Sequence, residues 1–197
     1  MSIEGKIAIV TGGANGIGFC TARKLLRNGA KEFFIFSKVK NGMKILSICI
    51  KIELKLYYFK SLYINEIRDK SVFKKVVNDL NGLDIVINNA GIYNDKKWEQ
   101  TMCINVVSGV IQGSLLAFDH MSKLKGGKGG TIVNIASIVA LDIIYSNPVY
   151  CASKHFVLAF SRSLASFQRY YNNTGIRILI MCPGVTTTSL LENPLSK

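Results

Sequence analysis

The sequence predicts an α/β fold, in which a doubly wound parallel sheet carries helices on both faces. Short apolar runs alternate with helix-length segments along the chain, and a glycine-rich turn joins the first run to the first helical segment. Such alternation is typical of parallel sheets, because each crossover between parallel strands needs a helix-length connection. Of the 197 residues, 49% are hydrophobic and 19% charged, which indicates a globular chain with one core.

The first βαβ unit occupies the N-terminal part of the chain. Residues 7–10 are a β-branched strand, residues 11–18 form the glycine turn, and residues 17–27 follow a helical pattern that stops at Asn28. A second strand follows at residues 33–36. Glycines in this position let backbone N–H groups at a helix N-terminus approach a pyrophosphate, so the unit predicts Rossmann-type dinucleotide binding.

The remaining elements continue the alternation. We expect a crossover helix within residues 43–59, strands at 62–67, 83–88, 131–136 and 176–181, and helices at 70–80, 98–124 and 148–170. Asn147 is a good N-cap and Pro148 suits the first position of the last helix. In this helix, the apolar residues recur every three or four positions, which predicts a buried face made of Val149, Ala152, Phe156, Ala159, Phe160 and Phe167.

Tyr150 and Lys154 lie four residues apart and therefore share one face of that helix. An ammonium close to a phenol favours the phenolate, so we expect the pKa of Tyr150 below its ordinary value of about 10. Such a phenol can exchange a proton with an alcohol or a carbonyl near neutral pH. Ser137 ends the strand at 131–136, which predicts its hydroxyl at the same spot.

Composition argues against several other classes of function. The net charge of +13 favours anionic ligands, but no nucleic-acid motif accompanies it, so we interpret it as a solvated basic surface. No continuous run of about twenty apolar residues predicts a membrane span. The five cysteines are odd in number and lack paired metal spacing, which predicts no metal site and reduced thiols in the cytoplasm.

Taken together, the motifs resemble the short-chain dehydrogenase/reductase family over nearly the full chain. The matching residues are Thr11-Gly12-x-x-x-Gly16-Ile17-Gly18, Asn88-Asn89-Ala90-Gly91, Asn105, Ser137, Tyr150-x-x-x-Lys154 and Pro183-Gly184. Within the family, the chain looks most like the NAD-dependent 15-hydroxyprostaglandin dehydrogenases and the short-chain alcohol dehydrogenases. Residues 94–99, 120–123 and 148–155 carry that closer likeness.

This resemblance implies the residues of a catalytic site. Tyr150 would be the general base in alcohol oxidation, and Lys154 would lower its pKa and hold the nicotinamide ribose. Ser137 would orient the substrate oxygen, Asn105 would hold a proton-relaying water, and Asn147 would contact the substrate together with Ser137 and Tyr150.

The resemblance also implies a cofactor site. Its residues would be Gly12, Asn15, Gly16, Ile17, Gly18, Ser37, Glu66, Ile67, Asn89, Ala90, Gly91, Tyr150, Lys154, Pro183, Val185 and Thr188. Asn89 and Gly91 would lie near the adenosine ribose, and Val185 and Thr188 near the nicotinamide carboxamide. NAD-dependent members usually have Asp where this chain has Ser37, and Lys38 after it would attract the 2′-phosphate of NADP. The closer likeness favours NAD, and NADP is the alternative.

The chain ends at Lys197, whereas family members continue through a substrate-covering segment and a last strand. We therefore expect one domain over residues 1–197, shortened at its C-terminus, with a homodimer interface on the helices at 98–124 and 148–170. The expected function is hydride transfer between NAD(P) and the CH–OH group of a secondary alcohol, such as a hydroxy-lipid of the prostaglandin type. Because the covering segment is absent, we expect weak cofactor binding and slow turnover. The alternative is a non-catalytic relative that binds nucleotide or partners without turnover.

Overall fold

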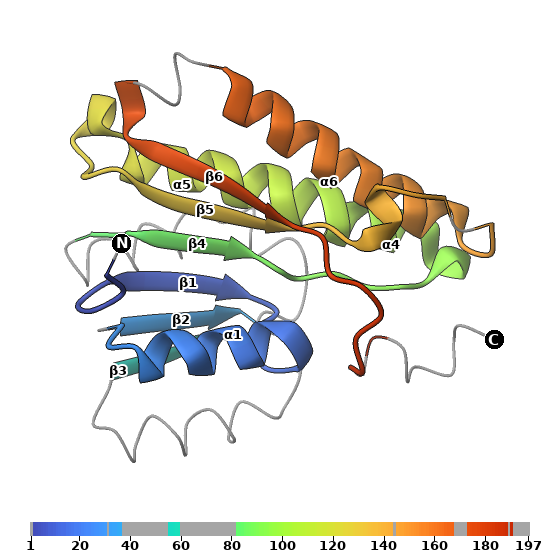
Figure 1. Ribbon diagram of the computed structural model, residues 1–197, viewed down its shortest axis with the longest axis horizontal. Coiled ribbons are helices and arrows are strands. Elements are labelled where there is room, and N and C mark those ends of the chain that lie inside the picture. Colours follow the sequence, from blue (N-terminus) through green and yellow to red (C-terminus); the bar gives the residue numbers. More distant parts are fainter. Residues whose placement is uncertain are drawn as a thin grey trace.

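The described strands of the computed structural model form one six-stranded sheet with the order β3-β2-β1-β4-β5-β6, and every neighbouring pair is parallel (Figure 1). The structure describes residues 2–30, 32–36, 55–59, 82–143, 145–167, 173–188 and 190. The strands are β1 (Ile7–Thr11), β2 (Glu32–Phe36), β3 (Lys55–Phe59), β4 (Ile85–Asn88), β5 (Gly130–Ile135) and β6 (Ile176–Met181). The α/β, doubly wound fold class predicted from the sequence is confirmed.

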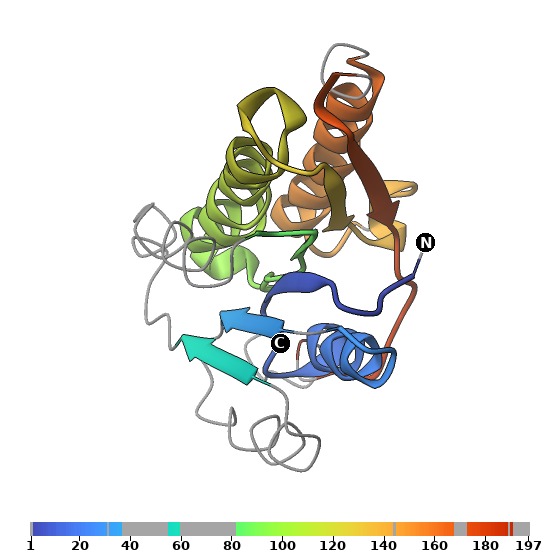
Figure 2. The same cartoon turned by 90° about the vertical axis from the view of Figure 1, so that its left-hand side faces the viewer.

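Helices cover both faces of this sheet. They are α1 (Gly16–Arg27), η2 (Asp95–Lys97), α4 (Trp98–Met102), η3 (Cys103–Gln112), α5 (Gly113–Met121), η4 (Lys123–Lys125), η5 (Ile138–Ala140) and α6 (Pro148–Ser166). Figure 2 shows α1 on one side of the sheet and α5 and α6 together on the other. Strand β1 is buried on both faces, because Ile7 and Ile9 pack toward α5 while Ala8 and Val10 pack toward α1.

The helical run from α4 through η3 to α5 was predicted as one helix. The structure confirms its place but makes η3 π-helical, with wider turns than the flanking α-helices. Two glycines let this run lie close to β4 and to the turn after it. A Cβ on Gly113 would overlap Asn88 Oδ1 in β4, and a Cβ on Gly109 would lie 3.2 Å from the Ala90 carbonyl oxygen in the turn. Among the described helices, the run Asp95–Met121 is long and apolar enough to cross a bilayer, but 61% of its most apolar window is buried inside the protein. It packs here as a core helix of the sheet.

The middle of the chain differs from the prediction. Residues 55–59 are strand β3 beside β2, so the crossover helix predicted over 43–59 is wrong for these five residues. Their sequence, Lys-Leu-Tyr-Tyr-Phe, is rich in aromatic residues that favour strands. The strand and helix predicted at 62–67 and 70–80 lie outside the described residues. Glu66 and Ile67, predicted as cofactor residues, also lie outside the described residues. The strand that pairs with β2 is β3, which ends at Phe59, seven residues before Glu66.

The buried face of α6 also differs from the prediction. Its buried residues are Tyr150, Cys151, Ser153, Lys154, Val157 and Ser161, whereas Ala152 and Ala159 are exposed and Phe167 is 54% exposed. The polar side chains of Ser153 and Ser161 are buried because they have buried hydrogen-bond partners. Asn105 Nδ2 donates to Ser153 Oγ at 3.0 Å, and Asn134 Nδ2 donates to Ser161 Oγ at 2.8 Å. The spacing of apolar residues along α6 gives no information on such hydrogen-bond partners in other elements.

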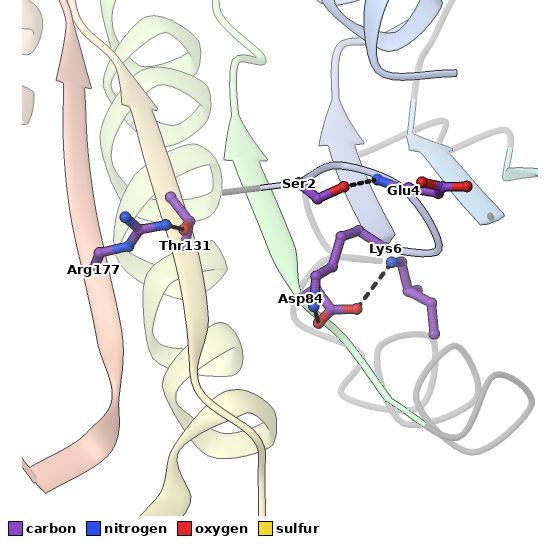
Figure 3. A network of polar contacts seen from close by, with 7 residues as sticks. Ser2, Glu4, Lys6, Asp84, Thr131 and Arg177 are labelled. Carbon is purple, nitrogen blue, oxygen red and sulfur yellow. Dashed lines mark hydrogen bonds and ion pairs between the residues drawn. The ribbon is translucent and has the colours of Figure 1, made fainter. Parts of the chain in front are cut away.

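A polar network holds the strands together at their amino ends (Figure 3). The Asp84 carboxylate accepts hydrogen bonds from Lys6 Nζ at 2.8 Å and from the Ile7 backbone N–H at 3.0 Å. The backbone oxygen of Asp84 accepts from the Thr131 N–H at 2.8 Å, and Arg177 donates to Thr131 Oγ1 at 3.2 Å. The network ties together the starts of β1, β4, β5 and β6, while Ser137, Tyr150 and Lys154 lie at the opposite, carboxyl edge of the sheet.

Candidate active site

The strand order reverses between β1 and β4, and in doubly wound sheets ligands bind at the carboxyl ends of the strands at such a point. Here the turn after β1 meets the turn after β4. Thr11 Oγ1 accepts hydrogen bonds from the N–H groups of Asn89 and Ala90 at 2.9 and 3.0 Å. Asn89 Nδ2 donates to the Thr11 carbonyl oxygen at 2.9 Å, so this side chain braces the glycine turn.

The glycines of this turn allow Asn89 and Thr188 to approach its backbone closely. Gly12 and Gly16 have φ values of +67° and +52°, which side-chain-bearing residues rarely adopt. A Cβ on Gly12 would lie 2.9 Å from Asn89 Nδ2, and one on Gly18 would overlap the same atom. Asn15 caps α1 by accepting from the Gly16 N–H at 2.9 Å. This cradle at a helix N-terminus fits the pyrophosphate of a dinucleotide.

The segment after β6 returns to this turn (Figure 1). A Cβ on Gly16 would lie 3.2 Å from the side chain of Thr188. The Pro183 carbonyl oxygen accepts from the Ile138 N–H at 2.8 Å, and Val185 is 93% exposed. The structure therefore places Thr188 beside the predicted cofactor turn and leaves Val185 in solvent. Ser37, Glu66 and Ile67, the other predicted cofactor residues, lie outside the described residues.

Lys154 is buried at the centre of the carboxyl edge, with 6% of its surface exposed. Its Nζ donates to the Ile135 carbonyl oxygen at 3.0 Å and lies 5.8 Å from the centroid of the Tyr150 ring. A Cβ on Gly91 would lie 3.6 Å from this nitrogen, so the lysine also reaches the turn after β4. Burial lowers the pKa of Lys154 to about 8, against a smaller opposing effect of Cys182.

Tyr150 differs from expectation in its proton affinity. Burial raises the pKa of its phenol above the ordinary value, a hydrogen bond with Ser137 lowers it, and the nearby Tyr93 raises it. The prediction of a lowered Tyr150 pKa is therefore wrong. The physical reason is that burial disfavours the phenolate, while the Lys154 ammonium is itself desolvated and bonded to a backbone carbonyl.

Ser137 and Tyr150 come together as the sequence predicts. Ser137 lies between β5 and η5, where its Oγ accepts from the Val139 N–H at 3.4 Å. Its hydroxyl also lies near enough to the Tyr150 phenol to lower the pKa of that phenol. Strand end and helix start thus place one hydroxyl and one phenol side by side, a pair that can hold a single substrate oxygen.

Asn105 lies in the π-helical segment and is fully buried. Its Oδ1 accepts from the Ile92 N–H at 2.8 Å, and its Nδ2 donates to the Ile92 carbonyl oxygen and to Ser153 Oγ, both at 3.0 Å. The side chain therefore fixes the loop after β4 against α6. π-helical turns occur often at functional sites, where they redirect side chains out of the regular helical pattern.

Two residues that sequence reasoning missed lie in this loop. The Tyr93 hydroxyl donates to Asn147 Oδ1, and its ring meets the Tyr150 ring edge-on, with centroids 4.6 Å apart at 74°. Asp95 accepts from the N–H groups of Val149 and Tyr150 at 2.8 and 3.0 Å. These partners are more than fifty residues apart in sequence, so no local pattern could have revealed them.

The described residues contain no cluster of three His, Cys, Asp or Glu side chains that could hold a metal ion. The site is instead built from a glycine cradle, a phenol, a hydroxyl and a buried lysine.

The family model for short chain dehydrogenases matches residues 6–196. The chain belongs to the short chain dehydrogenase family. It is 41% identical to 15-hydroxyprostaglandin dehydrogenase [NAD(+)] of Rattus norvegicus, over 98% of this chain and 73% of that protein. It is 38% identical to alcohol dehydrogenase 2 of Ceratitis cosyra, over 100% of this chain and 76% of that protein. Both likenesses agree with the resemblance seen in the motifs.

Solved structures share the fold of this short chain dehydrogenase. A short chain dehydrogenase/reductase from Burkholderia phymatum, in complex with NAD, aligns with a TM-score of 0.87 at 20% identity, over 98% of this chain and 70% of that chain. A putative short-chain alcohol dehydrogenase from Sinorhizobium meliloti aligns with a TM-score of 0.83 at 25% identity, over 96% and 77% of the two chains.

Proposed function

We propose that this protein is an NAD-dependent oxidoreductase that oxidises a secondary alcohol to a ketone, with Tyr150 as the general base. The observation that carries the proposal is the meeting of Ser137, Tyr150 and Lys154 at the carboxyl edge. Lys154 there reaches Gly91 in the turn after β4, and Asn89 of the same turn bonds the glycine turn. A proton acceptor, a hydroxyl that can hold the substrate oxygen and a buried cation at a dinucleotide cradle form a site for alcohol oxidation.

In the proposed reaction, Tyr150 acts in its phenolate form, which is a minor species at neutral pH because burial raises the pKa of this phenol. The phenolate takes the proton of the substrate hydroxyl while Ser137 holds the same oxygen. The bound cofactor supplies the hydride acceptor. Lys154, with a pKa of about 8, still carries a proton on most molecules at neutral pH and supplies positive charge beside the phenol. Asn105 keeps the loop after β4 in place, and we propose that a water beside it relays protons from Lys154.

The residues of the glycine cradle would hold the pyrophosphate, and Lys154 would hold the nicotinamide ribose. NAD is the proposed cofactor, because the relatives at about 40% identity carry NAD(+) in their names. Ser37 and Lys38 keep NADP as the alternative, since a lysine there attracts a 2′-phosphate. Comparison of the two dissociation constants at low salt separates them, and a preference for NADP above about tenfold would overturn NAD.

For the substrate, we propose a secondary alcohol on a lipid chain, such as a hydroxylated prostaglandin. The support is the 41% identity to a 15-hydroxyprostaglandin dehydrogenase. Asn147 would contact this substrate beside Ser137 and Tyr150. A homodimer through the α4–α5 run and α6 is also part of the proposal, and the 54%-exposed Phe167 offers apolar surface for it.

The experiment is a spectrophotometric assay of NADH formation with a panel of secondary alcohols that includes a 15-hydroxyprostaglandin. The proposal expects alcohol-dependent NADH formation that is lost in Ser137→Ala and retained in Tyr145→Phe, whose side chain is 97% exposed. Tight binding of NAD without turnover on any alcohol would instead support a non-catalytic nucleotide-binding protein.

A further inference from the structure

The helix that carries Tyr150 has an unusual beginning. The first N–H groups of an α-helix lack partners within the helix, and an N-cap side chain normally accepts from one of them. Asn147 occupies the N-cap position of α6 and makes no such bond. Its Oδ1 accepts the Tyr93 hydroxyl instead. Since Pro148 has no N–H, the first N–H groups that need an acceptor are those of Val149 and Tyr150.

Asp95 supplies that acceptor from a distant part of the chain. Its Oδ2 accepts from the Val149 N–H at 2.8 Å and its Oδ1 from the Tyr150 N–H at 3.0 Å. The next N–H, of Cys151, enters the helix by donating to the Asn147 carbonyl oxygen at 3.0 Å. One carboxylate therefore completes the helix start, and its negative charge suits the positive end of the helix dipole.

The support beneath Asp95 is firmly held. The Asn105 side chain bonds both the N–H and the carbonyl of Ile92, and the Asn94 carbonyl oxygen accepts from Thr101 Oγ1 at 2.7 Å. The Asn94 side chain accepts from the Lys97 N–H at 3.1 Å and so fixes the turn η2 that begins at Asp95. These contacts join the carboxylate to the π-helical segment and to the end of β4.

We propose that Asp95 is a positioning residue for the general base: it fixes the backbone of Tyr150 so that the phenol meets Ser137. This inference rests on the proposed function of Tyr150. Asp95 accepts a hydrogen bond from the backbone N–H of Tyr150 itself. A change in Asp95 therefore alters the backbone position from which the Tyr150 side chain extends. A displacement of about 1 Å in a reacting group can lower a rate a hundredfold.

A cap that merely stabilises the helix would have a different signature from a positioning residue. Loss of an N-cap costs about 0.5–2 kcal/mol of stability and need not touch the rate constant of the folded enzyme. A positioning residue lowers kcat far more than it changes the Michaelis constant for NAD, because the glycine turn lies on other elements and, of the proposed cofactor residues, only Tyr150 and Lys154 lie on α6.

The kinetic test compares Asp95→Ala, Asp95→Asn and the control Asp119→Ala. Asp119 is an exposed carboxylate at the far end of α5, paired with Lys125. We expect kcat of Asp95→Ala to fall by about ten- to a hundredfold with the Michaelis constant for NAD within twofold. Asp95→Asn keeps one carbonyl acceptor and should recover part of the loss, while Asp119→Ala stays at wild-type values. An unchanged kcat in folded Asp95→Ala would overturn the proposal.

A second measurement needs no turnover and so separates this inference from the proposed function. The pKa of Tyr150 is followed by fluorine NMR in fluorotyrosine-labelled protein, with the resonance assigned through Tyr150→Phe. In the wild-type background, Ser137→Ala should raise the pKa, because the bond with Ser137 lowers it. In the Asp95→Ala background, Ser137→Ala should change the pKa of Tyr150 very little. In the Asp95→Asn background, the change should lie between those two cases. Equal shifts in all backgrounds would show that Asp95 does not place the phenol against Ser137, whether or not the protein oxidises alcohols.

Discussion

Lys154 lies with its Nζ 5.8 Å from the centroid of the Tyr150 ring, yet it gives its hydrogen bond to the Ile135 carbonyl at 3.0 Å. The ammonium therefore lies beside the phenol ring, while its hydrogen bond anchors it to the end of β5. This arrangement explains why burial, and not the Lys154 ammonium, dominates the pKa of Tyr150.

The first prediction concerns the pH dependence of stability. The pKa of Lys154 is about 8 in the folded protein against 10.5 ordinarily, so between these values the unfolded chain holds a proton that the folded chain has lost. The free energy of unfolding therefore rises with pH across this window. At about 1.4 kcal/mol per pKa unit, the full rise over the shift from 10.5 to about 8 is about 3–4 kcal/mol.

Urea denaturation of wild type and Lys154→Met at about pH 8 and about pH 10 tests this, because the difference between the two proteins isolates the lysine. The wild type should gain stability relative to the variant as the pH rises. A constant difference between the two proteins would show that the buried amine does not titrate in this range.

The second prediction concerns Tyr93. Tyr93→Phe keeps the ring against Tyr150 but removes the hydroxyl that bonds Asn147 Oδ1. It also removes the titratable neighbour that raises the pKa of Tyr150, so the pKa seen in the pH profile of kcat/KM should fall. Because Asn147 loses its fixed orientation, the Michaelis constant for the alcohol should rise by about threefold to tenfold, while that for NAD stays unchanged. The matched control is Tyr145→Phe at an exposed position, and an identical response from both variants would contradict this role for Tyr93.

The third prediction concerns the approach of α5 to β4. A Cβ on Gly113 would overlap Asn88 Oδ1, and Asn88 is held in place by Nδ2 bonds to Asn134 and Ser114. Gly113→Ala should therefore lower the free energy of unfolding by about 1–3 kcal/mol. Gly184→Ala is the control, since a Cβ there meets nothing within 4 Å. Equal denaturation midpoints for the two variants would mean that the helix can move away from the strand at little cost.

These contacts also show what the sequence could predict. The strands β1, β4, β5 and β6 and the helices α1 and α6 follow from local apolar patterns and caps, so their places are confirmed. The meeting of Ser137 and Tyr150 was predictable for the same reason, because parallel strands bring their carboxyl ends to one edge.

The features that the sequence did not reveal depend on contacts between distant residues. The buried face of α6 follows its hydrogen bonds to Asn105 and Asn134, and not the apolar spacing of its own residues. Asn147 Oδ1 accepts the Tyr93 hydroxyl and does not cap α6, and Asp95 accepts from the first N–H groups of the helix instead. The pKa of Tyr150 depends on burial in the folded protein, which the spacing of Tyr150 and Lys154 cannot indicate.

Tyr150 is proposed to remove the substrate proton during hydride transfer to NAD. The most direct measurement uses a secondary alcohol with deuterium at its carbinol carbon and compares wild type with Tyr150→Phe. We expect deuterium in the reduced cofactor made by wild type, and a loss of turnover of about 10²–10⁴-fold in the variant, with the dissociation constant for NAD within a few-fold. A variant that forms deuterated cofactor at near wild-type rates would contradict the account.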